Sequence, residues 1–111
     1  MRTSLTEVEK DMNQFGLSVE AWIFLQVNLF QPLHHFKAKV WVFGSRARGD
    51  FKPYSDLDIL IEGESLLPKG WLESAREILE ESNLPIKVDL VLKEHLAESY
   101  LEEANREKIE V

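Results

Sequence analysis

The chain has 111 residues, a length that suits one globular domain with a substantial core and is short for two. Its formal net charge of −7 at pH 7 argues against a general nucleic-acid binder, which normally presents a basic face. The absence of cysteine excludes a disulfide framework, a thiolate metal site and a cysteine nucleophile. The amino-terminal residues MRTSLTEVEKDMNQ are too polar for a signal peptide, and no apolar run reaches the length of a membrane span. We therefore expect a cytoplasmic protein with a single domain over residues 1–111.

The first third of the chain predicts two helices. Ser4 and Glu7 form a capping box, and apolar residues at helical spacing follow as far as Gly16. Ser18 opens a second helix, VEAWIFLQVNLFQ, which we expect Pro32 to end. This helix is apolar nearly all round, so its outer surface is expected either to pack in the core or to form an interface with a partner or a second copy.

Three strands and two further helices are predicted beyond residue 38. The strands are KVWVF at 39–43, DLDILI at 56–61 and IKVDLVL at 86–92. An amphipathic helix begins near Trp71 and ends before Pro85, and a last helix with many glutamates covers about 94–107. This order predicts an α+β fold (mixed α/β), with a short mixed sheet of about three core strands and helices mainly on one face.

The segment GSRARGDFKPYSDLD, at 44–58, is the stretch most indicative of chemistry. Gly44 and Gly49 stand five positions apart, as in a P-loop, but Asp50 and Phe51 occupy the places where a P-loop needs Lys and then Ser or Thr. Basic residues outnumber the single acid between 37 and 52. This segment therefore suits a small polyanion such as a nucleoside triphosphate, although a solvated charged loop is an equally good interpretation.

Three aspartates are predicted on one face of the sheet. Because side chains alternate along a strand, Asp56 and Asp58 point opposite to the apolar row of the second strand, and Asp89 does the same in the third. If the apolar rows lie under the helices, all three carboxylates project from the uncovered face, where they repel one another unless a cation binds. Oxygen ligands of this kind suit Mg²⁺. A calcium loop is excluded because Leu60 and Ile61 stand where an EF-hand needs a ligand and glycine.

The glycine turn supplies groups for phosphate beside these acids. Gly44 lets a phosphate approach the backbone, and Ser45 offers a hydroxyl donor. Arg46 or Arg48 can neutralise further phosphate charge. Phosphate donors on one side and metal-binding carboxylates on the other predict metal-assisted attack on a nucleoside triphosphate.

Gly44-Ser45, ten residues and then Asp56-Leu57-Asp58 resembles the signature of the DNA polymerase β-like nucleotidyltransferase superfamily, and Asp89 in KVDLVL fits its third carboxylate. In size the chain is similar to the minimal nucleotidyltransferases (MNT, or MntA-like, proteins). The resemblance implies a nucleotidyltransferase fold in which Asp56, Asp58 and Asp89 bind two Mg²⁺ ions, Asp89 also being a candidate general base. It further implies that Gly44 and Ser45 bind the phosphates of ATP.

The resemblance also implies partners. Minimal members are typically encoded beside an all-helical HEPN-domain protein, often as antitoxin and toxin, and some transfer AMP to a tyrosine of that partner. We expect the same here, with activity completed by the partner, no membrane association, and self-association left open. Two alternatives remain: transfer to a small molecule, as in the similar aminoglycoside nucleotidyltransferases, and a non-catalytic antitoxin that acts by binding alone.

Overall fold

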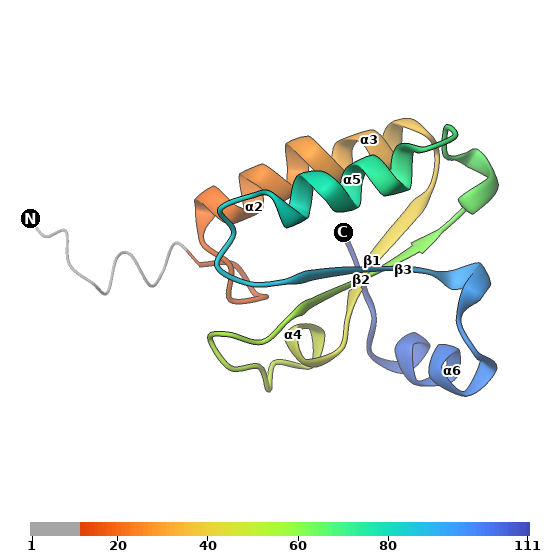
Figure 1. Ribbon diagram of the computed structural model, residues 1–111. Helices are drawn as coiled ribbons and strands as arrows, with labels where there is room; N and C mark the ends of the chain where they lie inside the picture. The colour runs from red at the N-terminus through yellow and green to blue at the C-terminus, as the bar shows by residue number, and fades with distance from the viewer. Residues whose placement is uncertain (1–11) are drawn as a thin grey trace, which may run out of the picture.

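The computed structural model describes residues 12–111, which form a four-stranded sheet between two unequal layers of helix (Figure 1). The capping box at Ser4 and Glu7, with most of the first predicted helix, lies outside the described residues. The elements are, in chain order, α2 (Val19–Leu25), the π-helix η1 (Gln26–Phe30), α3 (Gln31–His35), β1 (Lys39–Phe43), α4 (Ser45–Arg48), β2 (Leu57–Glu62), η2 (Glu64–Leu66), α5 (Trp71–Glu80), β3 (Val88–Leu92), η3 (Lys93–His95), α6 (Glu98–Glu107) and β4 (Ile109–Glu110). In residues 12–111 no helix is both long and apolar enough to cross a membrane.

The strand order is β3-β2-β1-β4. Strand β1 pairs antiparallel with β2 and with β4, while β2 pairs parallel with β3 through the crossover that contains α5. The mixed α+β fold predicted from the sequence is confirmed. The fourth strand was not predicted, because two residues carry no readable alternation of apolar and polar side chains.

The helix predicted to end at Pro32 continues for one more turn, so that prediction is wrong. The π-helical turn η1 precedes the proline, and the Gln31 N–H donates to the Gln26 carbonyl five residues earlier. A wider turn of this kind rearranges the backbone where a proline ring would otherwise meet the preceding turn. The helical run then ends at Lys37, which has a left-handed φ of 71°, and the Ala38 N–H donates to the Leu33 carbonyl at 3.0 Å.

The main core lies between the sheet and the layer formed by α2, η1, α3 and α5 (Figure 1). The apolar row of β2 predicted to face this layer, Leu57, Ile59 and Ile61, is fully buried. The opposite face of the sheet was expected to be uncovered, and this expectation is corrected. Helix α6 covers part of it, with a small second core formed by Trp41, Leu60 and Ala104. The candidate site lies at the end of this partly covered face.

Candidate active site

The turn after β1 requires glycine at its first position. Gly44 has a φ of 77° and a ψ of −158°, a conformation that strains any residue with a Cβ. The Asp58 carboxylate lies against it, so a Cβ added at Gly44 would overlap Asp58 Oδ2. Ser45 then begins α4, a single helical turn that Gly49 ends with a φ of 94°. The sequence Gly-Ser therefore places a tight, small turn directly on an acidic side chain.

Strand register brings the predicted acids to neighbouring strands. Asp58 of β2 pairs with Phe43 at the end of β1 on one side and with Asp89 of β3 on the other. The half-buried Asp58 therefore lies between the glycine turn and Asp89, while Asp56 is exposed just before β2 begins. The structure thus brings together the Gly44 turn, Asp58 and Asp89 as the two-residue period predicted.

The carboxylate of Asp58 is the most perturbed group of this set. Burial, followed by the negative charges of Asp89, Asp56 and Glu107, raises its pKa from 3.8 to about 6, while Arg48 opposes the rise. In the side-chain arrangement of residues 12–111, no three acidic or histidine groups are close enough together to hold a metal ion. The carboxylate oxygens are ligands that suit a hard cation. To bind one ion together, the carboxylates would have to come closer by rotation of their side chains.

Glu107, at the end of α6, is part of the site and was not predicted. Its Oε1 accepts a hydrogen bond from the Gly44 N–H at 2.9 Å, and its Oε2 accepts one from Arg48 Nη1, also at 2.9 Å. Its side chain is only 15% exposed. The sequence held no signal for this contact, because Glu107 is one of several glutamates in the last predicted helix.

The two arginines of the turn have different placements. Arg48 is exposed beside the turn, and its hydrogen bonds to Glu107 and Asp50 raise its pKa. Arg46 is 1% exposed, and its guanidinium donates to backbone carbonyls on both sides, among them Phe15 at 2.7 Å and Ser55 at 3.0 Å. The phosphate-binding role predicted for Arg46 is therefore corrected, because its donors are used inside the protein.

A cavity of about 380 Å³ lies between the turn and α6. Ser45, Arg48 and Asp58 line one wall, and Tyr100 and Glu103 of α6 line the other. Ser45 is half-buried and lines this cavity. Helix α6 thus forms a wall that the sequence did not reveal, and it makes this cavity acidic.

The known proteins and the family model that this chain matches have descriptions that agree with one another. The family model described as "Nucleotidyltransferase domain" matches residues 25–111. The "Probable protein adenylyltransferase MntA" of Haemophilus influenzae is 46% identical over 52 residues, which are 47% of this chain and 46% of that protein. The chain thus matches about half the length of this curated relative. A solved structure described as a minimal nucleotidyltransferase superposes with a TM-score of 0.63 at 30% identity, covering 83% of this chain and 94% of the other.

Proposed function

The chain belongs to the nucleotidyltransferase domain family, and on this basis we propose that it transfers AMP from ATP to a hydroxyl group of a protein acceptor. One observation carries the proposal: Asp58 lies between the Gly44 turn and Asp89. Nucleotidyl transfer requires this order in space: the phosphate groups bind at the Gly44 turn, and the acceptor hydroxyl binds beside Asp89. The adenylyltransferase name of the Haemophilus influenzae relative supports AMP as the transferred group.

The proposal includes Mg²⁺. Asp56, Asp58 and Asp89 would hold two ions, whose charge, when bound, offsets the burial and the carboxylate repulsion that together raise the pKa of Asp58. The ions would also polarise the phosphate oxygens during transfer.

Other residues of the chain would bind the phosphates and accept the proton during transfer. The Ser45 hydroxyl and the backbone at the start of α4 would bind the phosphates, and Arg48 would exchange a carboxylate partner for a phosphate. Asp89 would accept the proton of the acceptor hydroxyl as its oxygen attacks the α-phosphorus. The bond from the α-phosphorus to the bridging oxygen then breaks, and pyrophosphate leaves.

We further propose that the acceptor is a tyrosine of a helical HEPN-domain partner, and that the chain acts as the antitoxin of such a pair. An exposed apolar stripe on the outer side of α2 and η1 supports a protein partner. Val19 is 48%, Ile23 56% and Val27 55% exposed, and they follow one another at four-residue spacing on one helical face.

The test is transfer of label from α-labelled ATP to the protein encoded beside this chain, with and without Mg²⁺. We expect labelling of the partner on tyrosine, loss of labelling with Asp58→Asn, and unchanged labelling with Glu77→Gln, an exposed residue of α5. Labelling of an aminoglycoside by the chain alone would favour the small-molecule alternative. Neutralisation of the partner by Asp58→Asn without any labelling would favour an antitoxin that acts by binding alone.

A further inference from the structure

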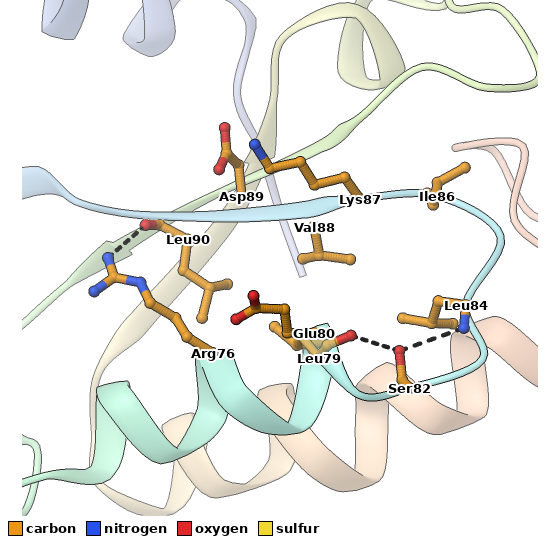
Figure 2. A pocket seen from close by; sticks show the side chains of 10 residues that line it. All are labelled: Arg76, Leu79, Glu80, Ser82, Leu84, Ile86, Lys87, Val88, Asp89 and Leu90. Atoms are coloured by element: carbon orange, nitrogen blue, oxygen red, sulfur yellow. Dashed lines mark hydrogen bonds between the residues drawn. The ribbon is translucent and has the colours of Figure 1, made fainter.

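A second cavity, of about 560 Å³, lies where the free edge of the sheet meets α5 (Figure 2). Its apolar part is formed by Leu79, Leu84, Val88 and Leu90. Figure 2 shows Val88 and Leu90 on the side of β3 that faces α5, while Lys87 and Asp89 project from the opposite side. We call this cavity the edge groove. It runs along the strand that carries Asp89, whose carboxylate projects from the other face of that strand.

The position of the edge groove relative to the site follows from the sheet order. The glycine turn follows β1, Asp58 is on β2, and Asp89 is on β3, so the three stand in a row that ends at the edge groove. In-line transfer needs the incoming hydroxyl on the side of the phosphorus opposite to the leaving pyrophosphate. If the phosphates bind at the Gly44 turn, the acceptor must approach from the side of Asp89, and the edge groove lies on that side.

Within residues 12–111, the strand beside the edge groove has backbone groups without a strand partner. Strand β3 is the last strand of the described sheet on this side, and the carbonyl of Lys87, just before β3, accepts from the Leu57 N–H of β2. Because the N–H and C=O groups of successive residues point alternately to the two sides of a strand, those of Val88 and Leu90 point away from β2. Arg76 Nη2 donates to the Leu90 carbonyl at 2.9 Å, which agrees with this alternation and leaves Val88 for another partner.

We propose that the edge groove binds an extended segment of the protein acceptor, which adds to the free edge of β3 at Val88 and carries its hydroxyl to Asp89. The inference rests on the proposed function and names its acceptor subsite. An extended peptide suits a groove with an apolar floor beside an unpaired strand edge, because main-chain hydrogen bonds provide affinity and side-chain pockets provide selectivity. Side chains of an added strand point alternately to its two faces, so an extended segment at this edge can fill the edge groove with one residue and present the next to Asp89, which favours this occupant over a nucleobase.

Two variants change the edge groove by different means. Val88→Pro removes the N–H that points away from β2, so it should leave the β2–β3 hydrogen bonds intact. Glu80→Arg places a bulky cation at the rim from α5 without altering the strand, and so stays informative if Val88→Pro folds poorly. Glu77→Arg, on the same helix and outside the edge groove, is the matched control.

The measurements separate acceptor from nucleotide. With the neighbouring gene's protein as acceptor, we expect both edge-groove variants to raise the KM for that protein at least about tenfold, because a displaced acceptor loses its near-attack position. Binding of a non-hydrolysable ATP analogue with Mg²⁺ should stay within about twofold of wild type. In NMR spectra, the Val88 amide should shift when the acceptor protein is added, and less when the ATP analogue is added.

Three results would overturn parts of this scheme in distinguishable ways. Unchanged KM in both variants would refute the acceptor groove while leaving the proposed function intact. Weaker binding of the ATP analogue with an unchanged acceptor KM would assign the edge groove to the nucleobase instead. Absence of transfer by the wild-type chain, despite binding of the analogue, would refute the proposed function, and the acceptor groove with it.

Discussion

Replacing Asp58 with asparagine should stabilise the metal-free protein while removing its activity. The pKa of this carboxyl rises from 3.8 to about 6 on folding, which corresponds to a destabilisation of about 3 kcal/mol at neutral pH as an upper limit. Partial exposure and screening by salt reduce this figure, and we expect a gain of about 1–2 kcal/mol in the free energy of unfolding. Asparagine keeps the shape of the side chain against Gly44 and removes only its charge.

The pH dependence gives the sharper test. Because the folded state raises the pKa of Asp58, it binds the proton more tightly than the unfolded chain does. The stability contributed by this group is therefore complete below about pH 4 and is lost as the pH rises through about 6. The difference between wild type and Asp58→Asn should thus be about 1–2 kcal/mol near pH 7.5 and close to zero near pH 4.

Urea unfolding in EDTA, followed by tryptophan fluorescence, measures both differences. Mg²⁺ should then stabilise the wild type more than Asp58→Asn, since the variant lacks a charged ligand. Glu77→Gln removes an exposed carboxylate and serves as the control for charge alone. Equal stability of wild type and Asp58→Asn near pH 7.5, or a difference that does not shrink near pH 4, would refute the assignment of Asp58 as a buried, repelled carboxylate.

Three further predictions concern other contacts. Arg46→Met should lower the free energy of unfolding by about 3 kcal/mol or more, because buried carbonyls lose their donor, and Arg46→Lys should not restore it, as urea titrations of the two variants will show. Glu107→Ala should cost about 1–2 kcal/mol through the lost bonds to Gly44 and Arg48. It should also lower the pKa of Asp58 in a carbon-13 NMR titration, and an unchanged pKa would contradict the electrostatic role of Glu107. Lys37→Gly should raise the melting temperature, since glycine relieves a left-handed φ worth about 1 kcal/mol, and a lowered melting temperature would contradict this.

The carboxylate arrangement could be predicted from the sequence because a strand has a rigid two-residue period. Once DLDILI and KVDLVL were interpreted as strands, the apolar residues fixed which face lay under the helices, and Asp58 and Asp89 had to lie on the other face. The glycine of the turn was equally predictable, since a sharp turn between strands favours that residue. These inferences depend on local backbone geometry, which a short stretch of sequence largely determines.

The roles of Arg46 and Glu107 could not be predicted, because they depend on contacts between distant parts of the chain. Arg46 and Arg48 are two positions apart on a single turn of helix. Packing of the segments at Phe15 and Ser55 around that turn buries Arg46 and leaves Arg48 exposed. Glu107 reaches Gly44 across 63 residues of sequence. Nothing in the spacing of charges distinguishes such a glutamate from its solvated neighbours.

The π-helical turn at Gln26–Phe30 accommodates one residue more than an ordinary helical turn. Loss of any one residue from this turn would restore the ordinary four-residue bonding and leave α3 close to its present rotational phase, because five residues of the wider turn advance about as far around the axis as four residues of α-helix. The Pro32 ring would then meet the carbonyl of the preceding turn. The number of residues between α2 and Pro32 is therefore constrained as strongly as their identity. Substitutions on its exposed stripe should be tolerated where single-residue deletions are not.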